Sequence, residues 1–186
     1  MGTAGGFNHW TPSALVRDQF HDDDQRKDAT FLEINTLENG VPSKYLTTVV
    51  LKGKGFVDAG LRKFVDDVII YRYADLLLLK AEAKNALGQD PSSEINAVRE
   101  RAYGENFQDR AFVNGSQEEN DEAILQERLF ELAFEGKRWW DLVRFGKAFE
   151  KVPSLQNREG QDHLLLFPIQ QATITLNSKI QQNPGY

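Results

Sequence analysis

The chain has 186 residues, a net charge of −6 and no cysteine, with 40% hydrophobic and 27% charged residues. This composition is ordinary for a globular protein, and the length predicts a single domain, residues 1–186, with a sizeable core. The acidic balance makes nucleic acid a poor partner, and the lack of cysteine excludes disulfides, thiol catalysis and cysteine-ligated zinc. No apolar run reaches the roughly 18 residues that a membrane span needs.

A polar and aromatic cluster stands near the N-terminus, on a glycine-led loop. Asn8, His9 and Trp10 combine hydrogen-bonding groups with a large ring, and binding residues are often carried on loops. We take these three residues as the candidate ligand-binding site. The alternative is that Trp10 packs against the first helix. Residues 1–6 lack the basic and apolar regions of a signal peptide.

One helix and one β-hairpin are predicted next. A Thr-Pro pair is suited to the N-cap and first position of a helix over residues 12–20. Residues 29–36 and 45–51 are rich in strand-forming residues, and the Asn39-Gly40 pair between them is a turn signal. The sequence therefore predicts a small two-stranded hairpin.

Two charged runs flank this hairpin. Asp22–Asp24 lacks the later glycine and the distant glutamate of a calcium-binding EF-hand, so a capped turn is the favoured interpretation. Lys52–Gly55 alternates lysine and glycine without the spacing of a phosphate-binding loop, which favours a solvated turn.

The longest helix is predicted over Val68–Leu87, and Gly88 is expected to end it. Four consecutive leucines make this helix apolar nearly all round, which predicts burial on more than one side. An Asp-Pro-Ser-Ser run then caps a second helix over residues 92–103. A long helix, a short turn and a partner helix make an antiparallel helical hairpin.

The stretch 127–146 carries the densest charge and aromatic bulk in the chain. It predicts a second helical hairpin, with helices over residues 118–135 and 138–150 and a left-handed helix end at Gly136. Two tryptophans in this stretch, at 139 and 140, are expected in the core. The apolar run 164–169 is expected to pack back onto that core.

The charged residues of this stretch allow two interpretations. Glutamates spaced by four form a stripe along one helix face, and an acid lies between two arginines on the next helix. A metal site in a helical bundle would want Glu-x-x-His, which is absent, and glycosidase carboxylates must flank a cleft. We therefore predict no metal, no cofactor and no catalytic residue, but a structural charge network of Glu127, Glu131, Glu135, Arg138, Asp141 and Arg144.

Four blocks of the sequence, in the same order, resemble the SusD/RagB family of nutrient-binding proteins. The stretch 127–146 reads E-R-L-F-E-L-A-F-E-G-K-R-W-W-D-L-V-R-F-G and is similar to the signature near the C-terminus of that family. The others are Y-R-Y-A-D-L-L-L-L-K-A-E-A from Tyr71, I-N-A-V-R-E-R-A from Ile95, and the terminal Q-N-P-G-Y.

The resemblance implies a mainly α fold of TPR-like antiparallel helical hairpins (an α-α superhelix) with a small β-hairpin and long loops. It implies a cell-surface lipoprotein of the bacterial outer membrane, in Bacteroidetes-type bacteria, that binds glycans without chemistry beside a SusC-like TonB-dependent transporter. Family members begin with a lipidated cysteine and a long N-terminal half, so the chain is expected to be a C-terminal fragment. The alternatives are a helical scaffold for protein–protein interaction and, less favoured, a glycoside hydrolase.

Overall fold

The computed structural model describes residues 11–186, which form two compact units. One unit ends at Gly136, and the other comprises Lys137–Tyr186. The expectation of a single domain stays a prediction. The candidate residues Asn8, His9 and Trp10 lie outside the described residues.

The first unit begins with two short helices, α1 (Ala14–Arg17) and α2 (Gln25–Thr30). The predicted helix over residues 12–20 is too long, because the chain leaves the helix to bury Phe20 among the rings of the core. The centroid of that ring lies 4.6 Å from the ring of Phe130. Helix α2 was not predicted, but its N-cap is the expected capped turn: the Asp24 carboxylate accepts the Arg26 backbone N–H at 2.9 Å.

Helix α2 leads into the predicted hairpin, strands β1 (Phe31–Glu38) and β2 (Val41–Val50). Glu38 pairs with Val41, so Asn39-Gly40 is a two-residue turn, and both of its residues have positive φ, as a type I′ turn requires. The prediction is confirmed. A second hairpin, β3 (Phe56–Asp58) and β4 (Leu61–Lys63), was missed because three-residue strands leave no readable alternation.

Helices α3 (Tyr73–Ala86) and α4 (Ser92–Tyr103) form the first helical hairpin. The prediction for α4 is confirmed at both ends, but α3 begins five residues later than expected. Residues 68–71 are Val-Ile-Ile-Tyr, which favour extended backbone over helix. The prediction that α3 is buried nearly all round is wrong as well, since Leu78 is fully buried but Leu76 is 55% exposed.

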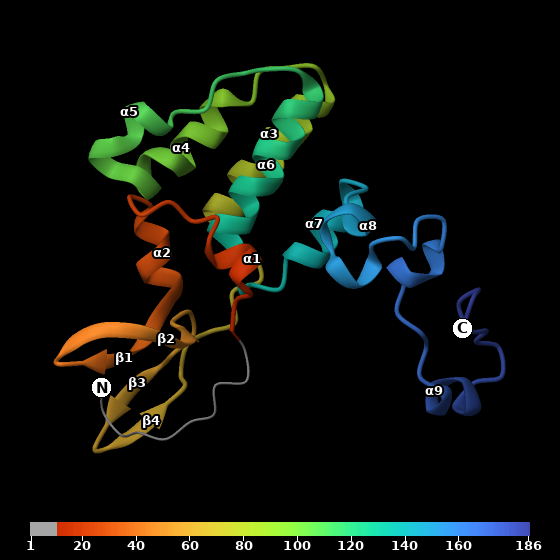
Figure 1. Ribbon diagram of the computed structural model, residues 1–186. Coiled ribbons are helices and arrows are strands. Elements are labelled where there is room, and N and C mark those ends of the chain that lie inside the picture. The colour runs from red at the N-terminus through yellow and green to blue at the C-terminus, as the bar shows by residue number, and fades with distance from the viewer. Residues whose placement is uncertain (1–10) are drawn as a thin grey trace. The chain divides into compact units, whose positions relative to one another are not determined.

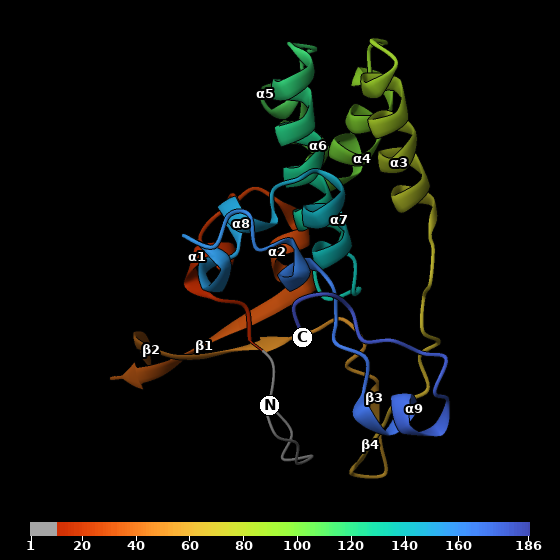
Figure 2. The same cartoon turned by 90° about the vertical axis from the view of Figure 1, so that its right-hand side faces the viewer.

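A short connection with α5 (Phe107–Arg110) leads to the longest helix, α6 (Gln117–Leu132). Ser116 and Glu119 cap its start reciprocally, as a capping box. The helix ends three residues before the predicted position, and Gly136 has the predicted left-handed conformation, with φ of 73°. Figures 1 and 2 show α3, α4 and α6 side by side, with α3 packed on both partners.

The second unit contains short helices joined by long loops. The predicted helix over residues 138–150 is broken at Gly146, which has a φ of 65°. The prediction of a core position is wrong for Trp140 (57% exposed), and the run 164–169 carries the exposed Phe167. The helices are α7 (Arg138–Arg144), α8 (Ala148–Lys151) and α9 (Gln171–Leu176), with single 3₁₀ turns at Pro153–Leu155 and Asp162–Leu165.

The C-terminal residues hold the exposed loop of this unit in place. The side-chain amide of Gln182 bonds both the N–H and the carbonyl of Ile169, at 2.8 Å each. Asn183 donates to the carbonyl of Phe167, and the Tyr186 hydroxyl donates to the carbonyl of Leu166. The tail is therefore an ordered part of the unit.

Candidate functional site: a buried charge network and two cavities

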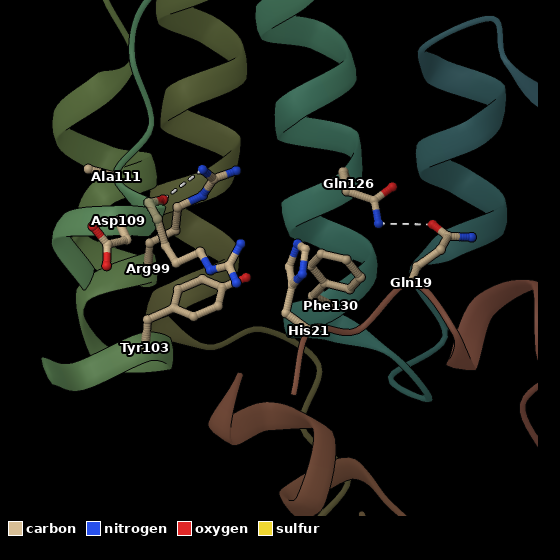
Figure 3. Close-up of a pocket in the computed structure, with 9 residues that line it drawn as sticks. Gln19, His21, Arg99, Tyr103, Asp109, Ala111, Gln126 and Phe130 are labelled. Atoms are coloured by element: carbon tan, nitrogen blue, oxygen red, sulfur yellow. Dashed lines mark hydrogen bonds between the residues drawn. The ribbon is translucent and has the colours of Figure 1, made fainter. Parts of the chain in front are cut away.

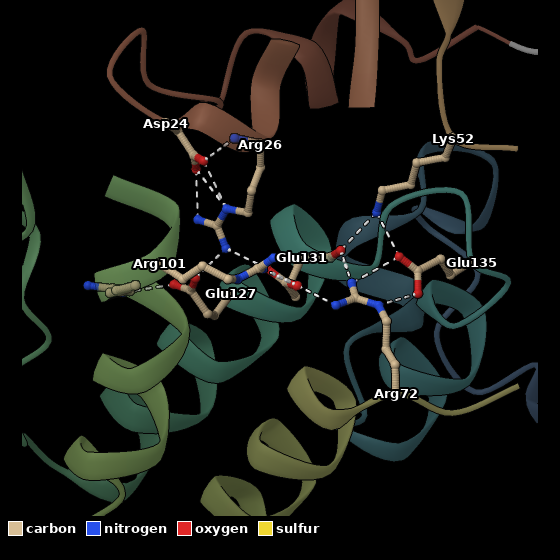
Figure 4. Close-up of polar contacts among 9 residues, drawn as sticks. Asp24, Arg26, Lys52, Arg72, Arg101, Glu127, Glu131 and Glu135 are labelled. Carbon is tan, nitrogen blue, oxygen red and sulfur yellow. Dashed lines mark hydrogen bonds and ion pairs between the residues drawn. The ribbon is translucent and has the colours of Figure 1, made fainter. Parts of the chain in front are cut away.

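Helix α6 presents carboxylates to a group of basic side chains from four other segments (Figure 4). Glu127 and Glu131 lie one helical turn apart, so both project from the same face. They are 1% and 3% exposed. Taking two charges out of water is costly, so such groups persist in a fold only when they are paired.

Glu127 is held from two sides. Arg26 at the start of α2 donates to one carboxylate oxygen at 2.5 Å, and Arg99 of α4 donates to the other at 2.7 Å. Arg26 is itself fixed by Asp24 at 2.7 Å. The capped turn before α2 is therefore tied to α6 through one guanidinium, and Glu127 is in turn bonded to Arg99 of α4.

Glu131 and Glu135 share the next set of partners. Arg72 donates to both carboxylates and to the backbone carbonyl of Glu131. Arg101 and Arg26 also reach Glu131. Lys52, at the end of the first hairpin, bonds the Glu135 carboxylate at 2.7 Å and the Glu131 carbonyl at 2.8 Å. The network thus joins the hairpin, α2, α3 and α4 to the end of α6.

The electrostatics favour full ionisation of these carboxylates. Burial alone would raise the pKa of Glu131, but the hydrogen bond from Arg72 and the charges of Arg101, Arg72 and Arg26 outweigh it and lower that pKa. The pKa of Glu135 is lowered in the same way by Arg72 and Lys52, against burial. Burial lowers the pKa of Lys52, and Glu135 offsets part of that shift. Carboxyl groups with lowered pKa values suit ion pairing, not proton donation at neutral pH.

Glu94 on α4 allows a pH prediction. Its carboxylate bonds Lys80 and Lys84 of α3, and although burial opposes the shift, these bonds lower its pKa to about 2. A carboxyl with a lowered folded-state pKa stabilises the fold fully above about pH 4.5 and loses that contribution as pH falls toward 2. We expect Glu94→Gln to flatten the fall of melting temperature between these values. An unchanged slope would contradict this assignment.

The sequence identified the carboxylates of the network but not their partners. The structure brings Glu127, Glu131 and Glu135 together. The sequence did not connect these glutamates to the basic residues Arg26, Lys52, Arg72, Arg99 and Arg101, although Arg72, Arg99 and Arg101 lie in the family-like blocks. The expectation that the lysine-glycine turn is simply solvated is wrong at Lys52, whose side chain is three-quarters buried and forms an ion pair with Glu135.

The remaining predicted members belong to the second unit. There Arg144 donates to Asp141 at 2.9 Å, one helical turn away on α7. That Arg138, Asp141 and Arg144 belong to one network with the glutamates of the first unit stays a prediction. A structural role for the whole set is likewise a proposal.

Helices α3 and α6 are joined by further polar contacts. Asp75 and Arg128, 1% and 2% exposed in their side chains, form an ion pair at 2.9 Å. Near the other end, the Asn120 amide donates to Asn85 at 2.8 Å. These contacts fix the register of the two helices.

Described residues of the first unit line a smaller and a larger cavity. The smaller, of about 500 Å³, is bordered by residues 19–21, α4, α5 and α6 (Figure 3). Arg99 and Tyr103 line it, and burial together with the charges of Asp24 and Glu127 raises the pKa of the tyrosine to about 12. The larger, of about 1060 Å³, opens over the charge network and is lined by residues that include Lys52, Arg101 and Glu135.

Within residues 11–186, no cluster of three or more histidine or acidic side chains is placed to hold a metal ion. Over the same residues, no helix combines the length and the apolar character that crossing a membrane requires.

The comparisons with known proteins identify the family. The model of the SusD family matches residues 62–164, more than half of the chain. The chain therefore belongs to the SusD/RagB family. It is 39% identical over 131 residues to SusD-like protein P38 of Formosa agariphila, covering 66% of this chain and 25% of that protein. It is 28% identical over 127 residues to the starch-binding protein SusD of Bacteroides thetaiotaomicron, covering 64% of this chain and 22% of that protein.

Solved structures support the same family assignment. Bacteroides fragilis NanU superposes with a TM-score of 0.76 at 38% identity, covering 92% of this chain and 38% of that one. A SusD superfamily protein from Bacteroides vulgatus superposes with a TM-score of 0.72 at 35% identity, covering 92% of this chain and 40% of that one. The expected fold class, mainly α with paired helices and a small hairpin, is confirmed. The chain spans about a quarter of the length of the curated relatives it matches.

Proposed function

We propose that this chain is part of a glycan-binding protein that acts in nutrient uptake at the bacterial outer membrane. The observation that carries the proposal is the family match, together with the likeness to a relative named for starch binding. In this proposal the whole protein is a surface lipoprotein. It binds oligosaccharide and delivers it to a SusC-like TonB-dependent transporter.

The proposed binding is non-catalytic. A glycosidase needs one carboxyl group with a raised pKa that acts as the acid, and a second carboxylate across the scissile bond. Glu131 and Glu135 face the larger cavity from α6 and its end. Both have lowered pKa values and are paired with arginine or lysine side chains. This supports a role in structure and recognition for these groups.

An array of immobilised polysaccharides and oligosaccharides, probed with the purified chain, tests the proposal. We expect binding to a subset of the glycans that free oligosaccharide competes away. A folded protein that binds none of them, as judged by its circular dichroism spectrum, would contradict glycan binding by this chain.

Trp10 is the sequence-derived candidate for sugar stacking within the cluster Asn8, His9 and Trp10. If its ring stacks on the C–H face of a sugar, Trp10→Ala should weaken glycan binding by about 1–3 kcal/mol and leave stability nearly unchanged. Titration of the bound glycan measures the first effect and a thermal melt the second. A lower melting temperature with unchanged affinity would show that Trp10 packs against the protein instead.

A further inference from the structure

The cavity of about 1060 Å³ over the charge network is large enough for a small ligand, and its lining has both apolar and charged parts. We propose that it binds a neutral oligosaccharide by enclosing one or two pyranose rings. This inference rests on the proposed glycan binding and assigns it a site in this chain. The assignment follows from the charge balance, the hydrogen-bonding groups and the exposed rings of the cavity.

The charges of the cavity argue for a neutral ligand. Its wall carries five basic and four acidic side chains, and one of the basic ones, Arg26, has a further carboxylate partner in Asp24. An anionic or cationic ligand would gain little net attraction from such a balanced wall. A neutral ligand with many hydroxyls can use both kinds of group, because charged side chains make stronger hydrogen bonds than neutral ones.

Several of these groups are available at the surface. Lys54, Asp66 and Asp67 are exposed on the wall. The side chain of Arg101 is 62% exposed and uses one terminal nitrogen for Glu131, while a guanidinium carries five donors in all. The ion pair with Glu131 restrains this guanidinium, so a sugar hydroxyl would meet a partly pre-organised donor (Figure 4).

A buried hydroxyl on the same wall adds a second observation. Thr30, 1% exposed, lines the cavity, and its hydroxyl has no hydrogen-bond partner among the described residues. A buried polar group without a partner is unfavourable, because it has lost its hydrogen bonds to water and gained none in return. A ligand hydroxyl that reaches Thr30 would remove this cost, which an apolar ligand could not do.

Two aromatic rings supply the apolar part of the proposed contact. Phe64 and Phe134 both line the cavity and are 69% and 44% exposed. Phe134 also has a φ of 63°, which a bulky residue rarely adopts. The next residue, Glu135, is fixed by ion pairs with Lys52 and Arg72, and strained backbone positions are concentrated at ligand sites. The C–H face of a pyranose packs on an aromatic ring while its hydroxyls face polar groups.

The test compares two exposed phenylalanines from the same part of the chain. Phe64 lines the cavity, whereas Phe56 on β3, 51% exposed, is not part of its lining. Calorimetric titration would use neutral gluco-, xylo- and manno-oligosaccharides, with oligogalacturonate as the charged counterpart. We expect neutral oligosaccharides to bind better than oligogalacturonate. Phe64→Ala should raise the Kd of the best ligand about tenfold, and Phe56→Ala should leave it unchanged.

The outcomes separate this inference from the proposal on which it rests. If the parent chain binds glycan but Phe64→Ala binds equally well, or if oligogalacturonate binds best, the assignment of the cavity is wrong while glycan binding stands. If the folded parent binds no glycan at all, the proposed function fails in this chain and the cavity assignment fails with it.

Discussion

Replacing Glu131 with glutamine is expected to lower the free energy of unfolding by about 3–5 kcal/mol. The variant keeps the volume of the side chain but removes the charge that Arg72, Arg101 and Arg26 share. The glutamate is 3% exposed, so at least one buried guanidinium would keep its desolvation cost without full compensation. Urea unfolding at neutral pH, followed by circular dichroism, measures the difference.

Glu118→Gln is the matched control for this variant. Glu118 lies in the first turn of the same helix and is exposed, so the same chemical change should alter the free energy of unfolding by about 0.5 kcal/mol or less. A Glu131→Gln protein as stable as the parent would contradict a structural role for the network. It would reopen the interpretation of these carboxylates as a chemical site.

The ion pair between α3 and α6 gives the second large effect. Asp75→Ala removes the ion-pair partner of Arg128, whose side chain is 2% exposed. The variant should therefore lose about 3–5 kcal/mol of stability. The helices would keep their apolar contacts, so we expect a weakened fold and not a different one. The midpoint of urea unfolding reports the loss.

A double variant shows whether stability is lost because Arg128 stays buried without Asp75 or because the ion pair itself was stabilising. Arg128→Met combined with Asp75→Ala removes both charges and keeps an apolar side chain of similar length. We expect it to recover most of the stability lost by Asp75→Ala alone, because no charge stays buried without a partner. Equal losses in the single and double variants would show instead that the contact itself supplies the stability.

Local signals located most of the fold. The hairpin was predictable because Asn39-Gly40 is a turn that few other sequences can form, and α4 because a capping run precedes it. The errors arise where tertiary packing decides. Phe20 ends α1 early by entering the core, and Gly146 breaks a helix that periodicity would have continued.

Only the glutamates of the candidate site were predictable from the sequence. The spacing of Glu127, Glu131 and Glu135 placed their carboxylates together, but spacing along one helix cannot identify partners from other segments. Arg26 lies about a hundred residues away in sequence from the glutamates it contacts, a separation that propensity and periodicity do not register. The cavity beside them is lined by Phe64 and Phe134, which follow β4 and α6, and the positive φ of Phe134 has no signal in the sequence.

Isothermal titration calorimetry with a glycan identified on the array tests the central claim, glycan binding without chemistry, most directly. If the chain binds glycan without chemistry, the heat pulses decline to the heat of dilution as the site saturates, and the glycan is recovered unchanged. Two results would contradict it: no heat of binding from the folded protein, or a sustained heat signal with shortened glycan, which would show turnover.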